Sequence, residues 1–85
     1  MQPMTKEQIF EQVQGILVDS FELDRSNVRL TAHLIDDLDF DSIDVIDLAV
    51  ELEKEAGFEV SEAELREIRF VHDIVELIYR HLQAA

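Results

Sequence analysis

The amino-acid sequence predicts an all-α fold: a four-helix bundle with three longer helices, one short helix and a long first loop. Three observations favour this fold. Apolar residues recur every three or four positions in several stretches of the chain. The pattern of a helix-capping box occurs three times, each time beside an apolar segment. The 85 residues include only two glycines and one proline, too few for a turn-rich β fold, and this length predicts a single domain over residues 1–85.

The first helix is expected to begin after Thr5 and to end near residues 19–21. Thr5 can cap the helix, Gln8 completes the capping box, and Met4 with Ile9 forms a hydrophobic staple. Apolar residues then follow at helical spacing: Ile9, Phe10, Val13, Ile16 and Leu17.

Residues 21–40 show neither a helical nor a strand pattern, and so long a loop in a small domain is typically functional or tied down. A helical turn inside this loop is compatible with the pattern. Five apolar residues are spaced so that they can fix the loop to a helical core: Leu23, Val28, Leu30, Leu34 and Leu38.

The second helix is expected over residues 42–56. Asp41 is its predicted N-cap, Asp44 completes the capping box, and Phe40 with Val45 forms the staple. Gly57 suits the C-terminal stop.

A third, short helix is expected after Ser61, with Glu64 completing its capping box. Val60 and Leu65 form the staple there. The last helix has no obvious N-cap, because Arg69 and Phe70 are weak capping residues. Its apolar face consists of Val71, Ile74, Val75, Ile78 and Leu82.

The second helix carries more apolar surface than one core face requires. One stripe suits a core: Val45, Leu48, Ala49, Leu52 and Ala56. Ile43, Ile46 and Val50 form a second, offset stripe that is flanked by acidic residues. Two interpretations remain open: a deeply buried central helix, or an exposed apolar strip that binds a partner protein.

The charge distribution excludes several classes of function. Residues 36–64 hold twelve acidic residues and one basic residue, a net charge of −11 out of −13 for the chain. Such acidity argues against binding nucleic acid or anionic membranes. The acidic segment is either a solvated face or a docking surface for basic partners. There is no cysteine, no membrane-length apolar run and no visible secretory signal, so we expect a cytoplasmic protein without membrane insertion.

Ser42 falls at the first position of the second helix, where its hydroxyl is not needed for capping. The start of a helix is a favourable place for a phosphate ester, because the dipole and unpaired N–H groups attract negative charge. Serine near a helix start is usually a capping residue. Ser42 is nevertheless a candidate for such an ester because a long loop precedes it and a surplus apolar stripe follows it.

At these residues the chain resembles the acyl carrier proteins, over about residues 5–82. The attachment motif of that family is typically Gly-x-Asp-Ser-Leu, and residues 39–43 have the sequence Asp-Phe-Asp-Ser-Ile. The resemblance implies that Ser42 bears 4′-phosphopantetheine through a phosphodiester, added from coenzyme A by a magnesium-dependent phosphopantetheinyl transferase. The thiol of this arm would carry acyl groups as thioesters, and the protein itself would catalyse nothing.

The resemblance also implies contacts with partner enzymes. Asp41, Asp44, Asp47 and Glu53 correspond to acidic contacts with arginines and lysines of acyl- and ketosynthase-type enzymes. The implied apolar contacts are Ile43, Ile46, Val50 and, at the end of the third helix, Ile68. The pathways implied are fatty-acid, polyketide-like or related lipid synthesis. We also expect the protein to be a monomer.

Three departures from the family pattern bear on the pathway. Asp39 replaces the usual glycine, Ile43 replaces leucine, and positive charge appears at Lys54, Arg66 and Arg69. The motif is more similar to carriers of specialised pathways, such as aryl polyene or polyketide-like lipids, than to housekeeping carriers.

Other sites are less well supported by the residues. Asp37, Asp39 and Asp41 imitate the start of an EF-hand loop, but Ser42 and Leu48 stand where glycine and glutamate are required. The histidines have no shared ligand spacing with nearby acidic residues, so no metal site is expected. From another functional class, an acidic helical adaptor or inhibitor of basic clefts would also explain the charge and the apolar stripe.

Overall fold

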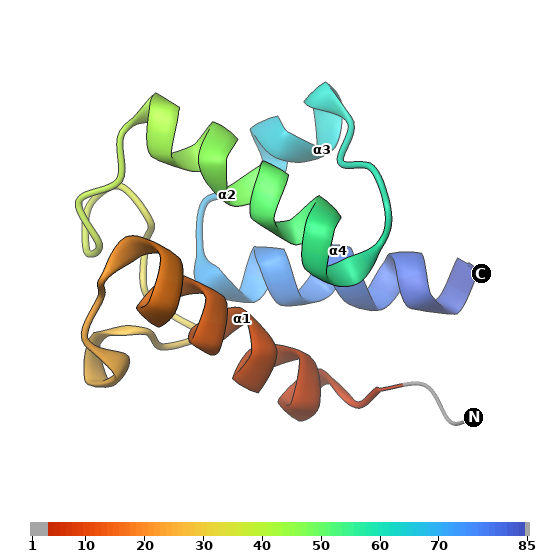
Figure 1. Cartoon of the computed structure of the whole chain (residues 1–85), viewed down its shortest axis with the longest axis horizontal. Coiled ribbons are helices and arrows are strands. Elements are labelled where there is room, and N and C mark those ends of the chain that lie inside the picture. The colour runs from red at the N-terminus through yellow and green to blue at the C-terminus, as the bar shows by residue number, and fades with distance from the viewer. Residues whose placement is uncertain (1–3, 85) are drawn as a thin grey trace.

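The computed structural model describes residues 4–84, and it is built from helices (Figure 1). Its elements are α1 (Lys6–Phe21), the short 3-10 helix η1 (Arg25–Asn27), α2 (Ser42–Ala56), α3 (Glu62–Glu67) and α4 (Val71–Ala84). The prediction of an all-α fold with three longer helices, one short helix and a long first loop is confirmed. Within residues 4–84 the nearest approach to a sheet is one isolated antiparallel bridge between His33 and Phe70.

The helices enclose one hydrophobic core to which the long loop also contributes. Helix α1 packs against α4, and α2 lies beside α3 (Figure 1). The fully buried side chains come from all three longer helices and the loop: Ile9, Val13, Leu17, Val28, Leu34, Leu48, Leu52, Val71, Ile74 and Leu77. The predicted face of α4 lacked Leu77, while Leu82 is only partly buried against the core.

Capping boxes fix the starts of α1, α2 and α3, as predicted. In each box, the N-cap side chain accepts a hydrogen bond from the backbone N–H of the third helical residue, whose side chain accepts one in return. The pairs are Thr5–Gln8, Asp41–Asp44 and Ser61–Glu64. Gly57 ends α2 in the left-handed conformation, with φ of 78°, which glycine adopts without a steric cost.

The long loop is fastened to the core by most of the predicted apolar residues. Val28, Leu34 and Leu38 are buried, and Leu23 packs against the core in part. Leu30 was wrongly predicted as an anchor, because its side chain is 45% exposed. It lines a groove with Phe10 and Val75. The predicted helical turn in the loop is η1, capped by Asp24.

The start of α4, which had no evident cap in the sequence, is capped by the long loop. The N–H groups of Val71 and His72 donate to the carbonyl oxygens of Ala32 and Leu30, both at 3.0 Å. Leu34 N–H donates in return to the carbonyl oxygen of Arg69, at 2.9 Å. The first two bonds satisfy donors at the end of the helix. The Asp73 carboxylate in the first turn of α4 also accepts the N–H groups of Arg69 and Phe70, at 3.1 and 2.9 Å. The beginning of α4 therefore depends on a segment about forty residues earlier.

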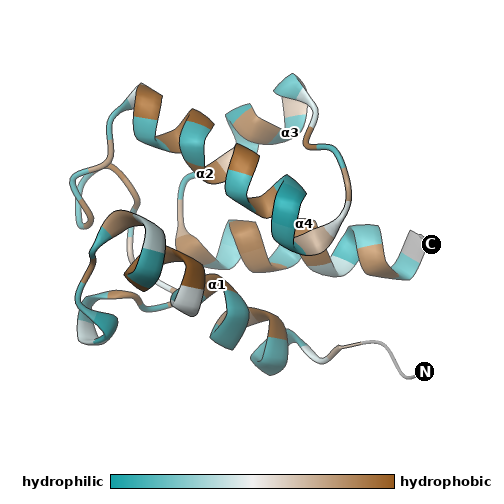
Figure 2. Ribbon diagram, viewed as in Figure 1, coloured by the Kyte–Doolittle hydropathy of each residue, from teal (hydrophilic) through white to brown (hydrophobic). Residues whose placement is uncertain are grey.

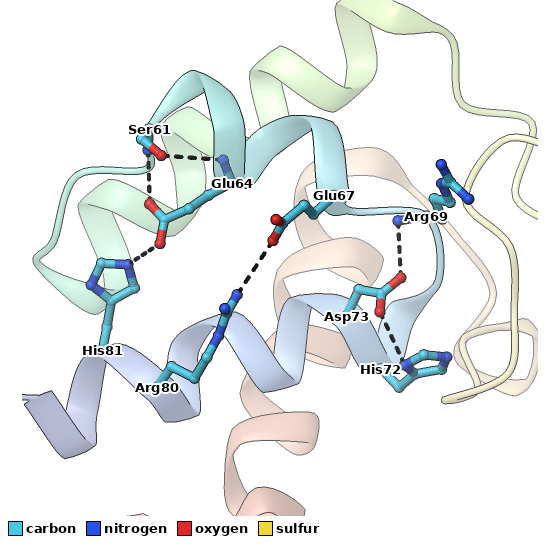
Figure 3. Close-up of polar contacts among 8 residues, drawn as sticks. All are labelled: Ser61, Glu64, Glu67, Arg69, His72, Asp73, Arg80 and His81. Atoms are coloured by element: carbon cyan, nitrogen blue, oxygen red, sulfur yellow. Dashed lines mark hydrogen bonds and ion pairs between the residues drawn. The ribbon is translucent and has the colours of Figure 1, made fainter.

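Polar contacts join α3 to α4 (Figure 3). The Glu64 carboxylate accepts the backbone N–H of Ser61 at 3.0 Å and lies 2.7 Å from Nε2 of His81. The ring of Phe58 stacks on His81 with centroids 4.0 Å apart. The Ser61 N–H lowers the pKa of Glu64 and the nearby His81 lowers it further, against the opposing effect of partial burial. The ionised form of Glu64 thus stabilises this junction.

We expect Glu64→Gln to lower stability at pH 7, and the deficit to shrink as the pH falls towards 4. Because the pKa of Glu64 is lowered from 4.5 in the folded state, its contribution is present above pH 4.5 and is lost as the pH falls through the folded value. Chemical denaturation at several pH values measures this. Glu59→Gln, which removes the same charge from an exposed residue, is the control. A deficit of equal size at pH 7 and pH 4 would contradict the assignment.

Candidate functional site

Ser42 is the first residue of α2 and its side chain is exposed. The cap beside it is complete without the serine, since Asp41 Oδ1 accepts the N–H of Asp44 at 2.9 Å and Asp44 Oδ2 accepts the N–H of Asp41 at 3.2 Å. Within residues 4–84 the hydroxyl of Ser42 has no hydrogen-bond partner. It is therefore open to a reagent from solvent.

The start of α2 suits a phosphodiester on Ser42. The N–H groups of Asp44 and Val45 bond to the side chain and carbonyl of Asp41. In the described part of the chain, no acceptor pairs with the N–H groups of Ser42 and Ile43. These two donors and the positive end of a 15-residue helix favour an anionic group at this point. The residues present thus fit a covalently attached phosphate group.

Phe40 holds the segment that leads to Ser42. Its side chain is buried and its ring centroid lies 4.9 Å from that of Phe21 at the end of α1. Its N–H donates to the carbonyl oxygen of Leu34 at 2.9 Å. With Phe40 fixed in the core, the chain returns to the surface at Asp41 and Ser42.

Asp39 has a left-handed backbone, with φ of 58°. Glycine adopts this conformation freely, whereas an L side chain is strained there, aspartate less than most. The turn before the serine therefore has a geometry suited to the glycine of the family motif. In this chain Asp39 bears the strain.

The four predicted acidic contacts differ in what else they do. Asp41 and Asp44 form the cap of α2, and Glu53 Oε2 accepts the N–H of Val60 at 3.0 Å. Asp47 is exposed, and no partner within the described residues engages its carboxylate. Three of these carboxylates therefore stabilise the fold. A substitution of Asp47 is the clearest test of a role in binding a partner.

The second stripe of α2 lies at the surface, so the interpretation of a deeply buried helix was wrong. Ile43, Ile46 and Val50 are 66%, 54% and 43% exposed, whereas Leu48 and Leu52 on the other stripe are fully buried. Apolar and hydrophilic segments alternate along the α2 ribbon (Figure 2). An exposed apolar strip on one helix is typical of a surface that binds another protein.

Ile68 does not join this surface. It is 8% exposed and belongs to the core. It follows the last residue of α3 in an extended conformation and leads into α4, and its side chain packs in the core. In this conformation Ile68 is therefore not at the surface with the other three apolar residues that the resemblance implies as contacts.

The sequence reasoning missed residues of α1 that face the same side as α2. An open groove of about 610 Å³ is lined by Asp19 of α1, by Glu22 directly after α1 and by Asp44, Asp47, Val50, Glu51 and Lys54 of α2. The sequence signal that could have found these residues is their negative charge at the end of α1. The last turn of α1 has no basic residue, and acidic groups are unfavourable at the negative end of a helix.

No cluster of three or more histidine, cysteine, aspartate or glutamate side chains in residues 4–84 is arranged to hold a metal ion. None of the helices in that range has both the length and the apolar character needed to cross a membrane.

Comparison with known proteins identifies similar sequences over nearly the whole chain. Residues 11–78 match the family model of the phosphopantetheine attachment site. The acyl carrier protein of Thermotoga maritima is 41% identical, over 92% of this chain and 96% of the relative. That of Petrotoga mobilis is 39% identical over 93% of each chain. That of Coprothermobacter proteolyticus is 35% identical over 93% of this chain and 96% of the relative.

We expect Asp39→Gly to raise the free energy of unfolding by about 0.5–1 kcal/mol, because it removes left-handed strain. Asp39→Val should lower it by about 1–2 kcal/mol, since a β-branched residue is poorly tolerated at positive φ. Urea denaturation measures both changes. Asp36→Gly in the same loop, where φ is not positive, is the control and should be destabilising. Equal destabilisation by both glycine substitutions would contradict the account of the turn.

Proposed function

Since the chain belongs to the phosphopantetheine-binding acyl carrier proteins, we propose that Ser42 is the residue that bears its arm. Members of this family are non-catalytic carriers that hold acyl groups as thioesters on 4′-phosphopantetheine, whose thiol supplies the chemistry. The observation that carries the proposal is the exposed, unpartnered hydroxyl of Ser42 at the first position of α2. The chain has no cysteine, which agrees with a thiol supplied by the cofactor.

The attachment step needs little from this chain beyond presentation of one hydroxyl. In the proposed transfer, Ser42 Oγ attacks the phosphorus that bears the pantetheine group in coenzyme A. A P–O bond forms, the phosphoanhydride bond breaks and the adenine nucleotide leaves. The transferase binds magnesium and accepts the hydroxyl proton. The cap formed by Asp41 and Asp44 and the buried Phe40 keep Ser42 at the surface for this reaction.

The family interacts with a phosphopantetheinyl transferase and with synthesis enzymes, and we propose that they dock on α2. Charge of −11 over residues 36–64 would steer a partner that has a basic patch. Ile43, Ile46 and Val50 supply exposed apolar area beside Ser42, and Asp41, Asp44, Asp47 and Glu53 surround it with carboxylates. Ile68 is left out of this surface because it is buried.

The proposed partners are acyl- and ketosynthase-type enzymes of fatty-acid, polyketide-like or related lipid synthesis. Asp39, Lys54, Arg66 and Arg69, which depart from the family pattern, support a specialised pathway. We further propose that the protein is cytoplasmic, is a monomer and consists of a single domain, as expected from the sequence.

Incubation with coenzyme A, magnesium and a broad-specificity phosphopantetheinyl transferase should add the mass of one phosphopantetheine group. The Ser42→Ala variant should gain nothing, because the accepting oxygen is absent. Intact-mass spectrometry measures both, and Ser61→Ala, which alters a capping serine, is the control that should still be modified. An unmodified wild-type chain would favour the acidic adaptor or inhibitor instead.

We expect Asp47→Lys to slow modification about three- to tenfold at low salt, with a smaller defect at high salt, because it reverses a steering charge. Initial rates at several salt concentrations measure this. Glu11→Lys makes the same change in net charge on an exposed residue of α1 that lines a groove with α4 residues. Equal defects in the two variants would show that net charge, and not docking on α2, controls the rate.

A further inference from the structure

Ile35 in the long loop is an exposed apolar residue that the proposed docking surface does not yet include. Its side chain is 54% exposed, as much as that of Ile46 on α2. We propose that Ile35 forms part of the surface that the phosphopantetheinyl transferase contacts, on the loop side of Ser42. This inference rests on the proposed role of Ser42.

The turn that presents Ile35 is held rigidly by its own hydrogen bonds. His33 Nδ1 accepts the N–H groups of Ile35 and Asp36 at 3.2 and 3.1 Å, and Asp37 Oδ2 accepts the N–H of His33 at 2.7 Å. The His33 carbonyl oxygen accepts the N–H groups of Asp37 and Leu38. The N–H of Leu34 bonds to Arg69, so every backbone N–H from residue 33 to residue 38 is satisfied.

Core packing on both sides of Ile35 adds to this rigidity. Leu34 and Leu38 are buried, so the loop cannot turn Ile35 inwards without losing an anchor. An apolar side chain that is exposed on an ordered turn loses little conformational entropy when a partner covers it. Such a residue is well suited to a binding surface.

Ile35 also lies close enough to Ser42 for one enzyme to cover both. The bond between Phe40 N–H and the Leu34 carbonyl oxygen joins the two segments, and Ser42 lies two residues beyond Phe40. Chain geometry then keeps the Cα atoms of Ile35 and Ser42 within roughly 15 Å. A usual interface covers about 800 Å² of each partner, a disc of roughly 16 Å radius. An interface centred on Ser42 therefore reaches Ile35 on one side and the α2 strip on the other.

The charges around Ile35 indicate the chemistry of the surface that covers it. The adjacent Asp36 side chain is 79% exposed, and Asp39 and Asp41 are exposed between Ile35 and Ser42. A complementary surface has an apolar depression bordered by lysine or arginine. The same chemistry suits the acidic residues and apolar strip of α2, so one transferase surface can contact both sides of Ser42.

Leu30 offers a matched control in the same loop. It is an aliphatic residue of similar exposure, at 45%, but it lines the groove with Phe10, Gln14 and Val75 of α1 and α4. Substitution of Leu30 therefore removes a comparable apolar side chain from a different surface.

The test compares initial rates of modification by the transferase at subsaturating carrier, for wild type, Ile35→Ser, Ile35→Leu and Leu30→Ser. We expect Ile35→Ser to lower kcat/KM about fivefold or more, as for an interface residue that contributes to binding. Ile35→Leu, which keeps the apolar volume, should stay within about twofold of wild type. Leu30→Ser should also stay near wild type. Thermal melting by circular dichroism checks that each variant is folded.

Three results would overturn the proposal: an Ile35→Ser rate equal to wild type, equal defects in Ile35→Ser and Leu30→Ser, or a failure of Ile35→Leu to restore the rate. In each of these cases a modified wild-type chain would leave the role of Ser42 intact. A wild-type chain that is not modified at all would overturn both this inference and the proposed function.

Discussion

The burial of Phe40 is the constraint on which the site depends. The residue before the α2 cap is fixed by its contact with Phe21 and by its hydrogen bond to Leu34, so α1, the long loop and α2 meet at this point. Because Asp41 forms the cap directly afterwards, Ser42 lies at the first position of the helix, at the surface. A hydroxyl that must be reached by other proteins is thus held by the core and not by a mobile loop.

The long loop has a structural role that its irregular sequence conceals. Its backbone caps α4, its turn is closed by His33 and Asp37, and its apolar residues fill the core. The same segment holds Phe40, so the α4 start and the Ser42 site are supported by one element. A long segment whose regular structure is limited to η1 is therefore fixed to the core at several points.

The features that could be predicted from the sequence depend on neighbouring residues. Capping boxes and the Gly57 stop are local patterns, and the second apolar stripe of α2 is visible in the residue spacing, although its exposure is decided only by the packing of the helix. The prediction failed at Leu30, and neither the burial of Ile68 nor the bonds from the loop to the start of α4 could be predicted, because contacts between segments far apart in the chain decide them. Apolar spacing shows that a residue can be buried, but only the packing of the loop against α4 shows whether it is.

Several acidic residues combine folding with the proposed docking, since Asp41, Asp44 and Glu53 accept backbone hydrogen bonds and still add to the negative surface.

The central claim is that the start of α2 carries the arm. Comparison of amide NMR spectra before and after modification tests this most directly. We expect the largest shifts at the unpaired N–H groups of Ser42 and Ile43. Shifts centred instead on Ser20, Ser26 or Ser61, with Ser42 and Ile43 unchanged, would contradict it.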